Sequence, residues 1–470
     1  MASYVPSTKE ERQAMLSAVG VEKAEDLFAH ISPEVLLTEP LDIPAGMSLL
    51  EAGRRMEEMA AKNRVFSQIF RGAGAYNHYV PAQVRYITSK EEFLTSYTPY
   101  QAEISQGVLQ SIFEYQTMIC ELTGMDVSNA SVYDGATAAA EAVAMCRERK
   151  RDTALVSELM HPDTLEVIGT YCEANGMKVE LIPEKDGVTD LEKMKAMMSE
   201  TTACVLVSQP NFYGRLEDAA AIGAAAHEGG AKYIVSVNPI SLGILKPPAE
   251  YGADIAVGEG QPLGMPLSFG GPYLGFMAAT KQMMRKLPGR IVGQTEDVDG
   301  RRAFVLTLQA REQHIRREKA SSNICSNQAL CAMTAAVYLT VMGPEGLAET
   351  ARQCMSKAHY AAAALEKAGC MLKYKGEYFH EFVTTTPIPA SRLMAVLEEK
   401  GILGGLPLSE DEILWCVTEV STRADIDRMA AAVTEAVKTG TASGASGDRN
   451  TEADSAPASE VRKAEEEVRA

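Results

Sequence analysis

The feature that most constrains the fold is a regular alternation of short apolar runs and helical patterns across the middle of the chain. This pattern predicts β-α-β crossovers and a mostly parallel sheet with helices on both faces. The runs are apolar throughout, so we expect strands that are buried on both sides. The strand-like runs lie at 153–157, 178–182, 203–208, 232–237 and 254–257, and helical patterns separate them at about 163–174, 189–199 and 217–228.

Ligands of such sheets bind at the carboxyl ends of the strands. Here those ends predict a site near residues 160–161, 209–211, 238–239 and 259–261. The last of them opens a stretch with glycines at 258, 260, 264, 270 and 271 and prolines at 262, 266 and 272, which returns as a strand at 273–279. A glycine-rich crossing of this kind fits a cofactor site and equally a connection without a ligand, and these residues alone do not separate the two.

A second candidate site is the turn Asp134-Gly135-Ala136-Thr137, which opens an alanine-rich helix that runs to about Arg149. Free N–H groups at a helix start can hold a phosphate. An N-cap by Asp134 explains the same residues, and its carboxylate would repel a phosphate. We therefore interpret this turn as a cap.

The segment from 71 to 100 is rich in tyrosine and includes Tyr76, Tyr97 and Tyr100. Aromatic rings with a polar tip suit binding sites and subunit interfaces. His78 lies between these tyrosines, which favours a role in the same place, although a lone histidine is more often structural. We predict that Tyr76, His78, Tyr97 and Tyr100 line an interface or a substrate channel.

Composition excludes several classes of function. A formal net charge of −18 argues against binding to nucleic acid or to an anionic membrane. The nine cysteines form no C-x-x-C pair, which indicates reduced thiols. The first residues are too charged for a signal peptide, and we expect no membrane span and a cytoplasmic protein.

The pattern predicts four regions. Residues 1–90 form a helical and extended arm that wraps a larger body or a partner, and 91–325 form the large α/β domain, in which 287–302 is a polar loop. Residues 326–438 form a small α+β domain that begins with helices at about 327–342 and 344–368. Residues 439–470 carry few apolar side chains, so we expect a disordered tail.

This layout resembles the pyridoxal-phosphate enzymes of aminotransferase type, also called fold type I. Within them the chain resembles the P-protein family of glycine dehydrogenase (decarboxylating) in the glycine cleavage system, and in particular the first, α subunit of its two-subunit form. The resemblance covers about 6–436 and rests on residues 71–76, 98–107, 113–117, 133–137, 242–248 and 268–272.

The resemblance also implies what this chain lacks. In the family's cofactor-bearing half, a lysine follows the strand before the glycine-rich crossing, and Gln261 falls in that position here. The aspartate that protonates the cofactor ring falls on Val237. A carboxamide forms no aldimine and valine carries no acid, so we expect a degenerate site with no catalytic residue on this chain alone.

The family therefore implies a heteromeric enzyme, which we expect to assemble as α2β2 and in which a β subunit holds pyridoxal phosphate. That enzyme would decarboxylate glycine and transfer the aminomethyl group to the lipoyl arm of H-protein. One alternative is a self-sufficient enzyme that uses Lys246 or Lys281, both of which look like surface lysines. Another is a non-catalytic scaffold, and no metal site is expected in any of these cases.

Overall fold

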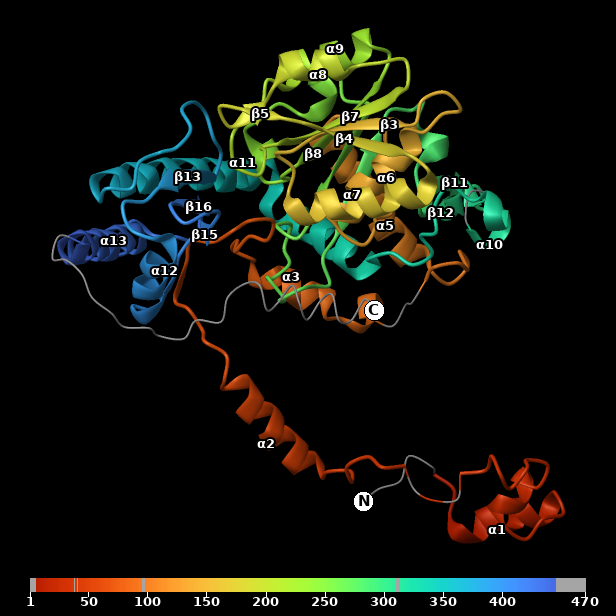
Figure 1. The fold of residues 1–470 in the computed structure, drawn as a ribbon. Helices are drawn as coiled ribbons and strands as arrows, with labels where there is room; N and C mark the ends of the chain where they lie inside the picture. The colour runs from red at the N-terminus through yellow and green to blue at the C-terminus, as the bar shows by residue number, and fades with distance from the viewer. Residues whose placement is uncertain (1–5, 38, 40, 95–97, 310–312, 445–470) are drawn as a thin grey trace. The chain divides into compact units, whose positions relative to one another are not determined.

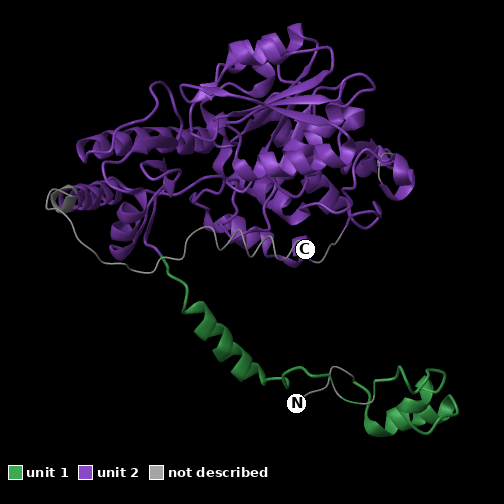
Figure 2. Ribbon diagram, in the orientation of Figure 1, with its two compact units in different colours: residues 1–65 green, residues 66–470 purple. Residues whose placement is uncertain are grey.

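The computed structural model describes residues 6–37, 39, 41–94, 98–309 and 313–444. The chain divides into two compact units, residues 1–65 and 66–470 (Figure 2). The first unit contains α1 (Lys9–Ala18), a short 3-10 helix at Ala24–Phe28 and α2 (Leu49–Ala60). Both α-helices begin with a capping box, in which Thr8 and Ser48 bond the N–H groups of Glu11 and Glu51. Neither helix buries any of its residues, so the packing of α1 and α2 adds little to the stability of this unit.

The second unit is built on a seven-stranded sheet with the order β2-β10-β9-β8-β7-β3-β4 (Figure 1). All neighbours from β9 to β4 pair in parallel, and β10 is antiparallel to both β9 and β2. This arrangement confirms the predicted mostly parallel α/β sheet. The strands are β2 (Val127–Ser128), β3 (Thr153–Ser157), β4 (Lys178–Ile182), β7 (Thr202–Gln209), β8 (Lys232–Val237), β9 (Ile255–Glu259) and β10 (Gly275–Ala279).

Alternate residues of the central strands enter two different cores, as the two-residue period of a strand requires. In β8, Tyr233 and Val235 belong to one core and Ile234 to the other. The first core also takes residues of α5 (Gln106–Thr123), α8 (Leu191–Met197), α9 (Ala219–Glu228) and α11 (Ala329–Lys367). The second takes residues of α6 (Gly135–Cys146) and α7 (Pro162–Asn175).

Two sequence-based expectations fail in this domain. The run at 178–182 is not buried on both faces, because β4 is the edge strand and Lys178, Glu180 and Leu181 are exposed. The expected polar loop at 287–302 instead contains β11 (Ile291–Glu296), which pairs with β12 (Arg302–Thr307) as a hairpin. Gln116 from α5 holds this hairpin through both backbone groups of Val292.

The helix α11 is interrupted at Gly343, whose φ of 62° and ψ of 177° break the helical path before Pro344. The two predicted helices at 327–342 and 344–368 are therefore confirmed. By length and composition alone α11 could cross a membrane. Its buried side chains, among them Tyr338 and Cys354, belong to the first of the two cores described above, which identifies α11 as a core helix.

The C-terminal part forms a three-stranded antiparallel sheet with the order β13-β16-β15. Its strands are β13 (Glu381–Thr385), β15 (Leu406–Pro407) and β16 (Glu412–Cys416), and α12 (Ala390–Glu399) and α13 (Arg423–Gly444) pack on it around Trp415. The helix α13 continues past Thr439, where we predicted disorder to begin, and residues 445–470 lie outside the described residues.

Shorter elements complete the second unit. They are β1 (Gln68–Ile69), which pairs with β14 (Ile402–Leu403), the small ribbon β5 (Glu184–Lys185) and β6 (Val188–Thr189), the helices α3 (Ala82–Thr88), α4 (Glu91–Leu94) and α10 (Gln313–Arg316), and 3-10 turns at Ser241–Gly243, Pro248–Tyr251, Met284–Lys286 and Arg317–Lys319.

Candidate functional site

A cavity of about 440 Å³ lies at the carboxyl ends of β3, β7, β8 and β9, where the strand order predicts a site. The loop at 73–76, the start of α6 and the small domain complete its wall. Its polar lining consists of Tyr76, Asp134, His161, Asp163, Thr164, Ser208, Asn211, Ser236, Asn238, Glu259, Tyr273 and Glu381. The lining is polar and acidic, and His161 is its one basic side chain among the described residues.

The side chain of Gln261 does not line this cavity. It is fully buried, and its Oε1 accepts a hydrogen bond from the N–H of Tyr76 at 2.9 Å. Its Nε2 donates to the carbonyls of Tyr76 and Met265 at 3.0 and 2.8 Å. Gln261 therefore ties the glycine-rich crossing to the loop at 73–76, which is a structural task.

Val237 lines the cavity at the end of β8 and is 3% exposed. None of the described residues that line the cavity is a lysine. The alternative lysines, Lys246 and Lys281, are exposed and lie outside the lining.

Glu259 brings a carboxylate to the first turn of α6. Its Oε2 accepts from the N–H of Gly135 at 3.0 Å, and its Oε1 accepts from the N–H groups of Gln261 and Leu274 at 2.9 and 3.1 Å. Burial raises the pKa of this carboxyl to about 7, and the three backbone hydrogen bonds only partly offset that effect. Asp134 caps the same helix through the N–H of Thr137 at 2.7 Å, which confirms the interpretation of this turn as a cap.

Glu381, at the start of β13, brings a second buried carboxylate to the cavity from the small domain. It accepts from the Tyr76 hydroxyl at 2.8 Å and from the N–H of Ala73 at 2.7 Å. Burial raises the pKa of Glu381 to about 7 in spite of these bonds. No local pattern indicated a site role for this residue, because a glutamate at a strand start is ordinary.

Both ring nitrogens of His161 have a hydrogen-bond partner in the backbone. Its Nε2 lies 2.9 Å from the carbonyl of Ala73 and must donate, while its Nδ1 accepts from the N–H of Asp163 at 3.2 Å. The ring thus offers the cavity no free proton acceptor.

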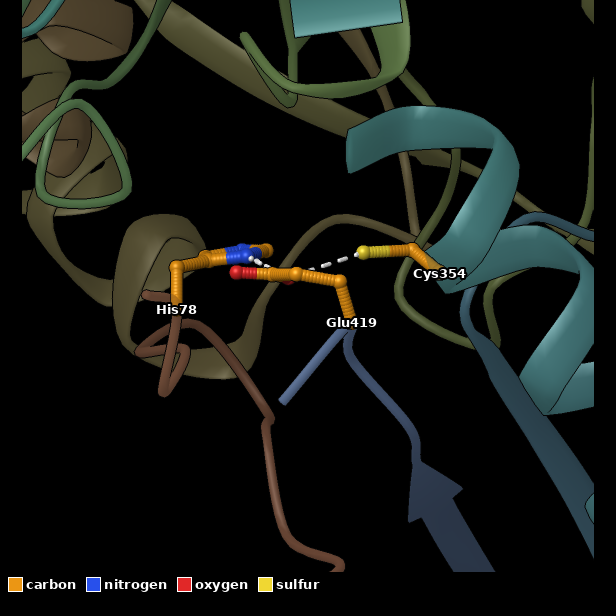
Figure 3. Close-up of side chains that lie close together, drawn as sticks. All are labelled: His78, Cys354 and Glu419. Carbon is orange, nitrogen blue, oxygen red and sulfur yellow. Dashed lines mark hydrogen bonds and ion pairs between the residues drawn. The ribbon is translucent and has the colours of Figure 1, made fainter. Parts of the chain in front are cut away.

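His78 is buried and contacts the small domain, not a surface. Its Nδ1 lies 2.7 Å from Oε2 of Glu419, and the thiol of Cys354 donates to the same oxygen at 3.2 Å (Figure 3). The other oxygen of Glu419 accepts from the N–H of Tyr79 at 2.6 Å. Burial alone would raise the pKa of Glu419, but these hydrogen bonds hold it below its usual range. The three side chains thus fasten the 76–79 loop to α11 and to the end of the small sheet.

The structure describes three of the four predicted interface residues, and these have different partners. The rings of Tyr76 and His78 lie 6.3 Å apart, close to His380. Tyr100 is 49% exposed and instead bonds Arg290 through its hydroxyl, with the guanidinium 5.0 Å from its ring centre. Tyr97 lies outside the described residues.

Comparison with solved structures defines the class of the fold. The chain matches a sphingosine-1-phosphate lyase from Burkholderia pseudomallei with a TM-score of 0.63 at 15% identity, covering 88% of this chain and 97% of that one. It matches an aspartate aminotransferase from Thermus thermophilus with a TM-score of 0.56 at 16% identity, covering 80% of this chain and 100% of that one. The fold is therefore that of the pyridoxal-phosphate enzymes of fold type I, as predicted.

The family follows from closer matches. The family model described as glycine cleavage system P-protein matches residues 2–433, so this chain belongs to that family. A probable glycine dehydrogenase (decarboxylating) subunit 1 from Moorella thermoacetica is 49% identical over 439 residues, covering 92% of this chain and 99% of the relative. A crystal structure of a glycine decarboxylase (P-protein) in inhibitor-bound form matches with a TM-score of 0.87 at 44% identity, covering 93% of this chain and 100% of that one.

The residues around the cavity do not fit pyridoxal phosphate. The described lining offers no amine for an aldimine, and Val237 offers no acid to protonate a pyridine nitrogen. Two carboxylates bond the first turn of α6, where a phosphate group would need the N–H donors. The geometry therefore agrees with a degenerate site.

Proposed function

We propose that this chain is the cofactor-free first subunit of a two-subunit glycine decarboxylase in the glycine cleavage system. A lysine-bearing second subunit holds pyridoxal phosphate, and the complex decarboxylates glycine and passes the aminomethyl group to the lipoyl arm of H-protein. Near-complete coverage of relatives named subunit 1 supports the role. The observation that carries the division of labour is the buried Gln261, which bonds the backbone where an amine should face the cavity.

This subunit contributes a surface to the partner. Tyr100 presents an exposed ring backed by Arg290, which is 4% exposed and has its Nε without a hydrogen-bond partner. A second candidate contact is Phe269, which is fully exposed in the glycine-rich crossing. Ser268 and Phe269 there have positive φ, a backbone conformation that costs energy for residues other than glycine and that gathers at functional sites. Assembly as α2β2 in the cytoplasm is part of the same proposal.

Two rival functions make different predictions. A self-sufficient enzyme would need an amine in reach of the cavity, and Lys246 and Lys281 are exposed and outside its lining. A scaffold subunit would change the amount of complex but not its catalytic rate.

The test reconstitutes the purified chain with its lysine-bearing partner. Borohydride reduction in the presence of pyridoxal phosphate is expected to label the partner chain alone, and glycine-dependent CO2 release should require both chains. Label on a peptide of this chain would contradict the proposal, and equal CO2 release by the partner without this chain would favour the scaffold.

A further inference from the structure

The first turn of α6 is occupied by carboxylates of the chain itself. Glu259 bonds the N–H of Gly135, and Asp134 bonds the N–H of Thr137. The turn borders the cavity at the strand ends, so its N–H groups and the positive end of the helix dipole would otherwise attract an anion from solution.

We propose that Glu259 is a built-in anion that takes the place of a bound phosphate and makes this cavity reject phosphorylated ligands. The inference explains how the fold can have this cavity and still not bind a phosphorylated cofactor in it. It does not depend on the activity proposed above, because its test measures anion binding by the chain alone.

Geometry supports a dedicated role for Glu259. Its two oxygens collect three backbone N–H groups, from the start of α6, the crossing and the return strand. These are the donors that would hold a phosphate. The backbone of Glu259 also passes so close to α6 that a Cβ on residue 135 would lie 2.8 Å from its nitrogen, so only glycine fits there.

Charge supports the same conclusion. The described lining combines Glu259 with Asp134, Asp163 and Glu381, and it contains neither lysine nor arginine. The one basic side chain, His161, has both ring nitrogens engaged by backbone groups, its Nε2 by the carbonyl of Ala73 and its Nδ1 by the N–H of Asp163. A phosphate dianion would enter a low-dielectric space lined by four carboxyl groups, and above pH 7, where Glu259 and Glu381 lose their protons, it would meet like charges, which is unfavourable.

The simpler alternative is that Glu259 only clamps the crossing. The two readings differ in what remains after its removal. If Glu259 is a stand-in for phosphate, Glu259→Ala leaves three N–H donors without a partner, one of them from Gly135 in the cavity wall, and a free anion can satisfy them. If it is only a clamp, the same variant loses stability and gains no ligand.

The experiment measures how inorganic phosphate changes the Tm of the full chain at about pH 8, above the pKa of about 7 that burial gives Glu259, and at constant ionic strength against chloride. It compares the natural chain, Glu259→Ala, Glu259→Gln and the control Glu296→Ala, which removes an exposed carboxylate on β11. We expect no phosphate-specific rise for the natural chain or the control. For Glu259→Ala we expect a saturable rise, with phosphate bound about tenfold or more tightly than by the natural chain, because charge-assisted hydrogen bonds replace repulsion.

Glu259→Gln keeps the size of the side chain and removes its charge, so it should bind phosphate more weakly than Glu259→Ala and more tightly than the natural chain. If Glu259→Ala does not fold, the comparison between the Gln variant and the control decides. Phosphate-specific stabilisation of the natural chain, or none in either Glu259 variant, overturns the proposal.

Discussion

The clearest quantitative test concerns Gln261, whose fully buried amide bonds three backbone groups. Gln261→Met removes three hydrogen bonds, to Tyr76 N–H, Tyr76 C=O and Met265 C=O, while the side-chain volume barely changes. At about 1 kcal/mol for each bond, the free energy of unfolding should fall by roughly 3 kcal/mol. We expect this full loss in the free energy of unfolding because residue 261 is fully buried and water cannot replace the lost hydrogen bonds.

Urea unfolding of the full chain measures this loss. The single tryptophan, Trp415, is buried in the small domain and reports its unfolding by fluorescence, while circular dichroism reports the whole chain. Gln294→Met on β11 is the matched control, because Gln294 is exposed and its replacement should change stability by less than about 0.5 kcal/mol. If Gln261→Met is no less stable than this control, Gln261 is not the tie that the hydrogen bonds indicate.

Three further predictions follow from single groups. Glu381 has a pKa of about 7 in the folded chain, above its unfolded value, so its contribution to stability is present in acid and is lost as pH rises through 7. In the natural chain this loss lowers the free energy of unfolding by roughly 3 kcal/mol between pH 4.5 and 8. Glu381→Gln should remove that part of the fall, as measured by urea titrations across pH. Asp134→Ala should cost about 1 kcal/mol in the same assay, and Asp134→Asn should recover most of it, because asparagine also caps a helix. Tyr100→Phe should leave the Tm of the chain alone nearly unchanged and lower glycine-dependent CO2 release by the reconstituted complex several-fold; unchanged kcat and KM would remove Tyr100 from the site.

The order and type of the central elements could be predicted from sequence because each rests on a local pattern. The runs 153–157, 178–182 and 232–237 match β3, β4 and β8 residue for residue. The predictions that were wrong concern features that depend on where an element lies in the tertiary structure. The edge place of β4 exposes side chains that a central strand would bury, and the β11–β12 hairpin gains its stability from Gln116, which lies far away in sequence.

The location of the cavity could be predicted from the strand ends, but its set of contacts could not. That Gln261 and Val237 stand at the positions of the cofactor's lysine and aspartate stays a prediction. Nothing local indicated that Glu381 would enter from the small domain, or that His78 would turn inward to Glu419. Both contacts join segments more than 300 residues apart, and each residue alone is ordinary.

Gln261 and Glu259 together explain why one substitution should not restore a cofactor site. The two residues are neighbours on the same crossing: one side chain bonds the 73–76 loop and Met265, and the other bonds the start of α6. A lysine at 261 would have to leave a fully buried amide position and break the bonds to Tyr76 before it reached the cavity. It would then meet a space whose N–H donors already bond carboxylates. The bonds of Gln261 and those of Glu259 therefore stabilise the same segment, and a substitution at one of the two positions leaves the bonds of the other in place.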